Sequence, residues 1–296
     1  MSGNNPAGRP GFLWAAPALL FFGLFGLAPI VVVAYLSLTD WNGLGDPLWA
    51  GTTNWENLAS DRDAGNGLLI TLTLTVLCWA TQTPLAMMFG TWAAGHQKIR
   101  AVVSSIFFLP LLLSTAAIAL IWKALLDPNF GVSAQVGPWV GIPDGNVLGD
   151  RTLALYAIVF VLLWQFLPFH MLLYQAAARQ IPQDLYEAAE IDGASPAQRF
   201  FRITVPQLRH TIIASSVLMI VGSMTYFETV LMLTNGGPGV STLILPLHMY
   251  NQGFVAFDMG YASAIALLLV AIGTGLSLLV VRLSGYSKMT SQREGV

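Results

Sequence analysis

The stretch EAAEIDGASPAQRFFRITVP, residues 187–206, is polar in a chain that is otherwise strongly hydrophobic. It holds five charged residues, two prolines and a central glycine. Over all 296 residues, 55% are hydrophobic, only 9% are charged, and the mean hydropathy is +0.65. Soluble domains carry about a quarter charged residues. The composition therefore predicts a polytopic membrane protein that keeps a charged insertion between two of its apolar segments.

Local signals within this stretch predict a helix, a tight turn and a second helix. Gly193 can adopt the left-handed conformation that ends a helix. Ser195 is a favourable N-cap, Pro196 suits the first helical position, and Gln198 completes a capping box. Pro206 is expected to break or kink the second helix where the next apolar segment begins.

The predicted helix pair contains one unfavourable residue and one small face. Asp192 lies at the C-terminal end of the first helix, where the helix dipole disfavours an acid, and Arg199 or Arg202 could compensate for it. A loop that only joins two spans needs a handful of residues. An ordered pair of helices instead suggests a docking element, in which Ala188 and Ala189 let another protein approach closely.

The apolar segments predict six transmembrane helices, because a helix needs about 20 apolar residues to cross a bilayer. The expected spans are residues 11–37, 68–94, 101–125, 152–176, 209–233 and 259–283. The connection 177–208 then lies between the fourth and fifth spans. Residues 1–10 and 284–296 are expected to be short tails, with one membrane domain over 11–283.

The lysine and arginine residues predict that both termini are cytoplasmic, since these residues gather on the inner side of a membrane. That orientation places three of them outside: Arg62, Lys123 and Arg151. It places ten inside: Arg9, Lys98, Arg100, Arg179, Arg199, Arg202, Arg209, Arg282, Lys288 and Arg293. Connection 177–208 is therefore expected to face the cytoplasm.

Polar and aromatic residues inside the fourth and fifth spans are candidates for a substrate pathway, because polar groups in spans usually face the bundle interior or a cavity. The candidates are Gln165, Phe166 and Phe169 in the fourth span and Met219, Gly222, Ser223 and Tyr226 in the fifth. The four in the fifth span are expected to form one helical face. Packing between helices is the alternative interpretation, since glycine and serine are common at such contacts.

Other residues argue against several classes of function. The chain has no phosphate-binding GxxxxGK[ST] motif, so it is not expected to hydrolyse ATP itself. His96, His170, His210 and His248 lack metal-ligand spacing, and the net charge of −2 does not suggest nucleic-acid binding. Glu228 is the single carboxylate well inside a predicted span. It could serve proton coupling, but a structural partner is the preferred interpretation, and His170 could line the pathway.

The charged stretch resembles the cytoplasmic loop of permease subunits of binding-protein-dependent ABC importers. The resemblance rests on EAA at 187–189, on Gly193 six positions after Glu187, and on ITVP ending at Pro206, with Val205 where relatives usually have leucine. The segment LTNGGPGVST, 233–242, is similar to a signature of the sugar and glycerol-phosphate branch. The resemblance extends over nearly the whole chain.

This resemblance implies an all-α type I importer permease fold with six spans, in a bacterial cell membrane. The loop would be the coupling helix, with Glu187, Ala188, Ala189, Asp192 and Gly193 contacting a cytoplasmic ATPase. It further implies a second six-span permease, an extracytoplasmic solute-binding protein and a sugar substrate. No cofactor is expected in this chain, because ATP and magnesium would bind the ATPase dimer. A glycerol-phosphate or polyol permease remains an alternative, as does an ion-coupled secondary transporter.

Overall fold

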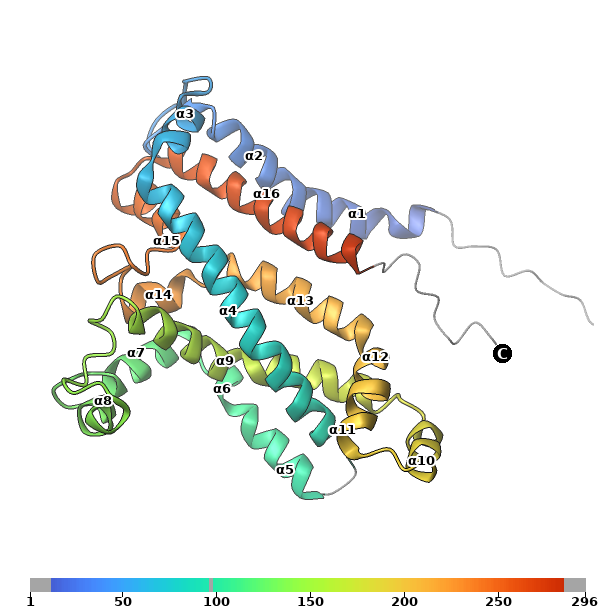
Figure 1. Cartoon of the computed structure of the whole chain (residues 1–296). Coiled ribbons are helices and arrows are strands. Elements are labelled where there is room, and N and C mark those ends of the chain that lie inside the picture. Colours follow the sequence, from blue (N-terminus) through green and yellow to red (C-terminus); the bar gives the residue numbers. More distant parts are fainter. Residues whose placement is uncertain (1–11, 96–97, 285–296) are drawn as a thin grey trace, which may run out of the picture. The chain divides into compact units, whose positions relative to one another are not determined.

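The computed structural model describes residues 12–95 and 98–284, and they form two compact units. The first unit contains the described residues up to Asp61 together with Met249–Leu268. The second contains Arg62–His248 and the described residues from Leu269 onward. Almost all regular structure in both units is helical (Figure 1). The predicted all-α membrane fold is therefore confirmed.

The first unit joins an apolar helical stretch to a group of short elements. Its elements are a short 3₁₀ turn Phe12–Ala15, α1 (Ala16–Phe22), a π turn Gly23–Leu27, α2 (Ala28–Leu36), β1 (Thr39–Asp40), β2 (Leu48–Trp49), α3 (Thr53–Ser60), a π turn Asn251–Val255 and the start of α16 (Met259–Leu283). The two strands pair antiparallel, with Thr39 opposite Trp49. The Asn54 amide donates to the carbonyl oxygens of Ser37 and Thr39, at 3.0 and 2.8 Å. The Tyr261 hydroxyl donates to Asp61 at 2.6 Å.

The second unit is built around two long helices, α4 (Arg62–Ala93) and α9 (Leu153–Ala178), which pack along each other (Figure 1). The remaining elements are α5 (Lys98–Phe107), α6 (Leu109–Leu112), α7 (Thr115–Leu125), α8 (Val132–Val136), a 3₁₀ turn Gly137–Val140, α10 (Gln183–Ile191), α11 (Pro196–Arg199), a π turn Phe200–Thr204, α12 (Val205–Gln207), α13 (Arg209–Ser223), α14 (Phe227–Leu233), α15 (Leu245–Tyr250) and the end of α16. A core cluster of Ala86, Leu167, Tyr174 and Leu208 joins α4 and α9 to the start of α13.

The close approach of α4 to α9 depends on Gly90. A Cβ atom added there would lie 2.6 Å from the carbonyl oxygen of Met171 and 2.7 Å from the Cβ of Tyr174. Beyond this contact, the Gln175 amide donates to the carbonyl oxygen of Ala93 at 3.0 Å. Glycine is therefore the residue that lets the two backbones meet.

We expect Gly90→Ala to lower the free energy of unfolding by about 1–3 kcal/mol, because the added methyl overpacks a contact made by backbone. Gly65→Ala, in the same helix, is the matched control, since a Cβ at Gly65 meets nothing within 4 Å. The measurement is denaturant unfolding of the purified chain in detergent micelles. Equal unfolding free energies for the two variants would contradict the assigned contact.

The predicted spans match the helices in part. Four helical stretches are long and apolar enough to cross a membrane: residues 16–36, 62–93, 153–178 and 259–283. Two further spans arise only if each of two bent helix pairs is counted as one: Lys98–Leu112 with Thr115–Leu125, and Pro196–Gln207 with Arg209–Ser223. Residue 11 of the first predicted span, the predicted tail 1–10, and the predicted tail 284–296 except for Ser284 lie outside the described residues.

Two of the predicted spans are interrupted for identifiable reasons. The third is broken at Ser114, whose extended backbone and side-chain oxygen cap a new helix by accepting from the Ala117 amide. The prediction of a continuous helix over 209–233 is wrong, because α13 ends at Ser223 and the chain turns before α14 begins at Phe227. The segment after α14 is irregular up to the start of α15, and the hydroxyls of Thr234 and Thr242 lie 2.7 Å apart across it.

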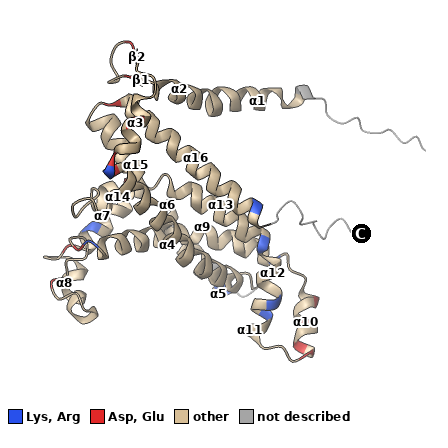
Figure 2. Cartoon of the chain, turned by 45° about the horizontal axis from the view of Figure 1, so that its top comes forward, with Lys and Arg blue, Asp and Glu red and all other residues tan. Residues whose placement is uncertain are grey.

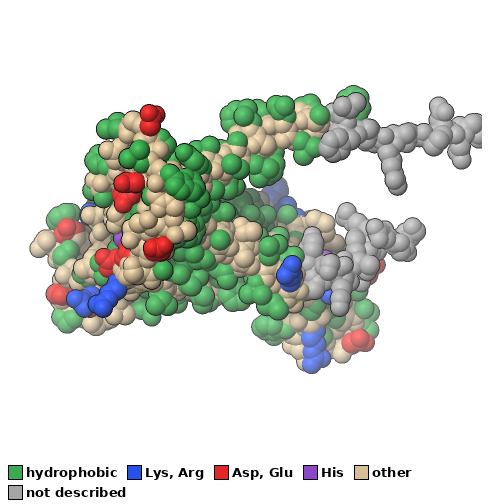
Figure 3. Space-filling model, turned by 90° about the horizontal axis from the view of Figure 1, so that it is seen from above, with side chains coloured by type: hydrophobic (Ala, Val, Ile, Leu, Met, Phe, Trp, Pro, Cys, Tyr) green, Lys and Arg blue, Asp and Glu red, His purple; other side chains and the backbone are tan. Residues whose placement is uncertain are grey.

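The surface of the chain is that of a membrane protein. Large hydrophobic side chains are exposed along α1, α2, α4, α5 and α16, and they cover much of the visible face in Figure 3. Charged residues are concentrated at the ends of helices. At the start of α9, Asp150 accepts from the amides of Leu153 and Thr152, and these hydrogen bonds lower the pKa of its carboxyl.

Candidate functional site

The connection between α9 and α13 forms the predicted helix-turn-helix. Gly193 has a φ of +77°, and it follows the last helical residues of α10. Its amide donates to the carbonyl of Glu190 at 3.0 Å, and the Ala194 amide reaches back to Ala189 at 2.8 Å. These two bonds define a Schellman C-cap, in which a left-handed residue satisfies the last free carbonyls of a helix. The predicted glycine turn is confirmed.

The start of the second helix is also formed as predicted. The Ser195 side chain accepts from the Gln198 amide at 3.3 Å, and the Gln198 side chain accepts from the Ser195 amide at 2.8 Å. This is the expected capping box. The chain then passes through a π turn, and it bends by 68° between the segment Pro196–Gln207 and α13. The expected kink at Pro206 therefore occurs two residues later.

The ion pair in this connection differs from the expected one. Arg199 binds Glu190, with Nη1 2.9 Å from Oε2, and no described residue forms an ion pair or hydrogen bond with the Asp192 carboxylate. The prediction that Arg199 or Arg202 compensates Asp192 is wrong. The reason is geometric: the left-handed turn at Gly193 directs α11 back along α10, which brings Arg199 to Glu190. Figure 2 shows acidic residues on α10 and basic residues on α11.

A second contact between the helices was not anticipated from the sequence. The Tyr186 hydroxyl lies 2.8 Å from the hydroxyl of Thr204, which is buried. Together with the Arg199–Glu190 pair, it ties α10 to the π turn that leads into α13. The helix pair is thus held as a unit by contacts at both of its ends.

The five residues predicted to contact an ATPase lie together on this unit. Glu187, Ala188, Asp192 and Gly193 are exposed and Ala189 is half-buried. Ile191 and Phe201 were missed in the sequence analysis, although they are 87% and 68% exposed. The only signal in the sequence was their apolar character.

A separate cavity of about 460 Å³ lies between α7, α9, α13 and α14. Aromatic and hydroxyl side chains form its walls. The rings of Phe166 and Tyr226 stack with centroids 5.2 Å apart and planes inclined by 23°. Phe169, Gly222, Thr115, Thr225 and Thr229 also line it, and no lysine or arginine does so among the described residues. The Thr229 hydroxyl is buried and makes no hydrogen bond within the described part of the chain.

The structure brings four of the seven predicted pathway residues to this cavity and places three elsewhere. Phe166, Phe169, Gly222 and Tyr226 line it. Ser223 accepts a hydrogen bond from Thr75 at 2.7 Å, and the sulfur of Met219 lies 3.5 Å from the Thr83 hydroxyl. Both of these residues therefore pack against α4.

Gln165, the seventh, is buried beside the cavity rather than in it. Its amide donates to the Thr115 hydroxyl at 3.1 Å, and its carbonyl oxygen has no described partner. The expectation that Met219, Gly222, Ser223 and Tyr226 share one face is wrong, because α13 ends at Ser223 and Tyr226 belongs to the following turn.

His170 and Glu228 both line the cavity. His170 Nδ1 lies 2.9 Å from the Ser215 hydroxyl. Glu228 is exposed in the first turn of α14, and no described residue forms an ion pair or hydrogen bond with it. The preferred interpretation of Glu228, a structural carboxylate with a partner, therefore has no support in the described residues.

The sequence of the chain matches one protein family and is similar to permease proteins of sugar transport systems. The family described as "Binding-protein-dependent transport system inner membrane component" matches residues 82–285. The multiple sugar-binding transport system permease protein of Streptococcus mutans is 31% identical over 93% of this chain and 94% of its own length. The trehalose/maltose transport system permease protein of Thermococcus litoralis is 30% identical over 87% of this chain and 88% of its own.

The fold matches a solved transporter as well. A chain from a bacterial ABC transporter involved in the import of the acidic polysaccharide alginate superposes with a TM-score of 0.80. The superposition covers 95% of this chain and 96% of that one, at 21% sequence identity. A second structure of an alginate transporter, in complex with a periplasmic protein that holds an alginate pentasaccharide, gives the same TM-score.

Proposed function

The chain belongs to the family of inner membrane components of binding-protein-dependent transport systems, and we propose that it forms half of the ATP-driven translocation pathway for a neutral sugar or oligosaccharide. It is a permease subunit of an ABC importer. The observation that carries the proposal is a cavity rich in aromatic and hydroxyl groups on the same unit as an ordered, exposed helix pair. The cavity is suited to binding a sugar, and the helix pair is suited to contact with an ATPase subunit.

The helix pair is the proposed joint with a cytoplasmic ATPase. Glu187, Ala188, Ala189, Asp192 and Gly193 would meet the ATPase surface. The alanines permit close approach, and the two acids can bind basic groups. The Tyr186–Thr204 and Arg199–Glu190 contacts hold the two helices together, and the second helix continues through a bend into α13. Since α13 lines the cavity, a movement of the helix pair would also move the wall of the cavity. The proposed mechanism is alternating access driven by ATP on that partner.

The cavity is the proposed sugar pathway. The faces of Phe166, Phe169 and Tyr226 can stack on a sugar ring, and the hydroxyls of Thr115 and Thr225 can exchange hydrogen bonds with its hydroxyls. The relatives named for multiple sugars and for trehalose and maltose support this substrate class. An anionic glycerol-phosphate is disfavoured, because the cavity holds the Glu228 carboxylate and its described lining includes no lysine or arginine.

The proposed assembly contains a second six-span permease, an ATPase dimer and an extracytoplasmic solute-binding protein. The charge distribution supports an orientation with both termini and the helix pair in the cytoplasm. The structure of the alginate transporter with its periplasmic protein supports a binding protein on the opposite side only by analogy of fold. ATP and magnesium would bind the ATPase dimer.

Affinity purification and sugar uptake test the proposal. A tagged chain taken from its native membranes in mild detergent should bring down a P-loop ATPase and a second permease, identified by mass spectrometry. Uptake should cease on ATP depletion and survive an uncoupler. Glu228→Gln should retain most of that uptake, because a neutral sugar does not need the carboxylate. Purification without an ATPase, or uptake that an uncoupler and Glu228→Gln both abolish, would favour an ion-coupled transporter instead.

A further inference from the structure

The cavity of the proposed sugar pathway contains one ring nitrogen that the protein itself does not pair. His170 lies on α9 at the positions i+4 from Phe166 and i+1 from Phe169, so it shares a helical face with Phe166. All three side chains line the cavity of about 460 Å³, and His170 is the one imidazole in its described lining. The ring is therefore a distinct polar group on a wall made largely of aromatic and hydroxyl side chains.

The imidazole ring is held in one orientation by two contacts. His170 Nδ1 lies 2.9 Å from the hydroxyl oxygen of Ser215 on α13, and both side chains are buried. The ring also meets Phe169 edge to face, with the two ring centroids 5.2 Å apart and the planes inclined by 80°. Because the two ring nitrogens point in different directions, the bond at Nδ1 leaves Nε2 directed away from Ser215.

The second nitrogen, Nε2, is open to the cavity. Within residues 12–95 and 98–284 it has no hydrogen-bond partner. It is not enclosed by protein either. The described side-chain atoms that are both enclosed and unpaired include the Gln165 carbonyl oxygen and the Thr229 hydroxyl, but not Nε2. Nε2 is thus the ring atom through which the cavity can offer a hydrogen bond to a ligand.

A sugar hydroxyl suits this nitrogen in either tautomer of the ring. If Nδ1 accepts from Ser215, Nε2 carries the proton and donates; if Nδ1 donates, Nε2 accepts. A hydroxyl is both a donor and an acceptor, so it pairs with Nε2 in both cases. A carboxylate or phosphate oxygen can only accept, and the Glu228 carboxylate on the same wall would repel it.

We propose that Nε2 of His170 exchanges a hydrogen bond with one particular hydroxyl of the transported sugar, which makes His170 a specificity-determining residue. The inference rests on the proposed function, because it takes the cavity as the sugar pathway. Stacking on aromatic rings accepts many sugars. A hydrogen bond to one hydroxyl distinguishes among them, since an analogue that lacks this hydroxyl leaves the protein's own polar group unpaired.

Uptake of monodeoxy sugars tests the assignment, in proteoliposomes that contain the complex and internal ATP. The parent sugar is the one that wild type takes up fastest from a mixture of neutral mono-, di- and trisaccharides that includes maltose and trehalose. The quantity measured is the ratio of the initial uptake rates of the parent sugar and of each monodeoxy derivative. A solute-binding protein common to all samples has the same preference in each, so its contribution cancels when ratios are compared between variants.

Two amide variants separate the contact with Ser215 from the contact with the sugar. His170→Asn places its amide near the position of Nδ1 and ends short of the cavity. For one hydroxyl position, its uptake ratio should be about tenfold lower than that of wild type. His170→Gln extends its amide to about the position of Nε2 and should keep most of the wild-type ratio.

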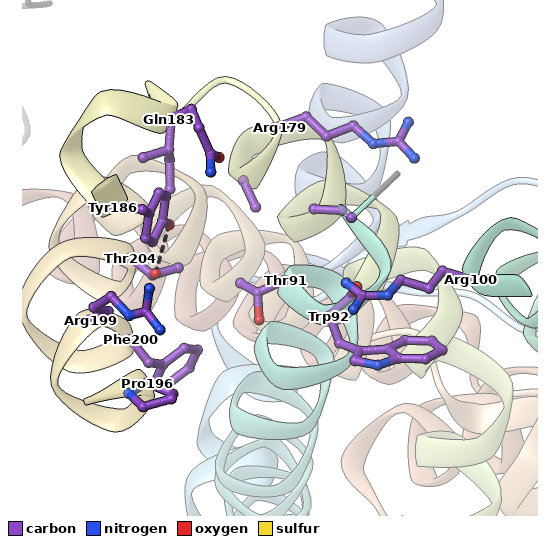
Figure 4. Close-up of a pocket in the computed structure, with 14 residues that line it drawn as sticks. Thr91, Trp92, Arg100, Arg179, Gln183, Tyr186, Pro196, Arg199, Phe200 and Thr204 are labelled. Carbon is purple, nitrogen blue, oxygen red and sulfur yellow. Dashed lines mark hydrogen bonds between the residues drawn. The ribbon is translucent and has the colours of Figure 1, made fainter. Parts of the chain in front are cut away.

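Thr91→Val is the control, because it removes a hydroxyl from a different cavity, at the C-terminal end of α9 (Figure 4). It should keep the wild-type ratio at every position. Both rates come from one preparation, so a smaller amount of assembled complex does not change the ratio.

The outcomes separate this inference from the proposed function. Equal ratios for wild type and His170→Asn at every hydroxyl position would overturn the role of His170. A ratio for His170→Gln no higher than that for His170→Asn, or an equal change in Thr91→Val, would overturn it as well. Absence of ATP-dependent uptake of every sugar by wild type would count against the proposed function instead.

Discussion

Gly193→Val should reduce the amount of ATPase that co-purifies with the chain by about tenfold, and sugar uptake should fall with it. Gly193 has a φ of +77°, which costs an ordinary L-residue about 1–2 kcal/mol and a β-branched residue more. A tenfold change corresponds to about 1.4 kcal/mol. Space is not the reason, since a Cβ at this position meets nothing within 4 Å. The expected loss comes from backbone strain in the Schellman turn.

Gly193→Asn is the matched control for this prediction. Asparagine tolerates the left-handed conformation better than other non-glycine residues, so this variant should retain most of the ATPase. Equal losses for valine and asparagine would mean that the side chain, rather than the backbone angle, disturbs the interface. Full retention by Gly193→Val would contradict the role of the turn. The second permease should co-purify with both variants, because no membrane helix is altered.

Gly222→Leu should lower sugar uptake by at least about tenfold while leaving the ATPase bound. A Cβ at Gly222 would lie 3.1 Å from the Tyr226 hydroxyl, so a leucine there would displace the phenol and occupy the cavity. The stack between Tyr226 and Phe166 would be disturbed as well. Small-ligand sites combine apolar walls with a few precisely placed polar groups, so a bulky side chain that fills the space or moves a polar group weakens binding.

The measurement is initial uptake of a labelled sugar into proteoliposomes that contain the complex and internal ATP. Gly275→Leu is a suitable control, since a Cβ at Gly275, in the end of α16, meets nothing within 4 Å. Normal uptake by Gly222→Leu would show that the cavity is not on the pathway. Loss of both uptake and ATPase would indicate a general effect on folding, which unfolding of the same sample would reveal.

The membrane class and the helix pair α10–α11 were predictable because their signals are local. Apolar composition alone predicts helices that cross a bilayer, since lipid requires every backbone group to be paired within the segment. The turn at Gly193 and the cap at Ser195 depend on residues at most five positions apart. Interactions of that range are present in the sequence before any tertiary contact forms. The family resemblance rests on the stretch 187–206 together with residues 233–242, and the match over 82–285 confirms it.

The content of the cavity was predicted only in part. Phe166 and Phe169 lie on the continuous helix α9, where helical spacing holds, and both reach the cavity. Met219 and Ser223 do not, because α13 packs that side against α4. Periodicity can place residues on one face of a helix, but it does not tell which neighbour that face meets, nor that the helix stops at Ser223.

The sequence by itself determined that this protein is an all-helical membrane component with a structured, charged helix pair between its apolar segments. Only the tertiary structure decided which side chains meet between helices. It joined the Thr75 hydroxyl of α4 to Ser223 of α13, and the Gln175 amide of α9 to the carbonyl oxygen of Ala93. Caps and turns depend on neighbours along the chain, whereas these contacts depend on the packing of α4 against α9 and α13. Such long-range packing is a property of the whole folded unit and leaves no periodic trace in the sequence.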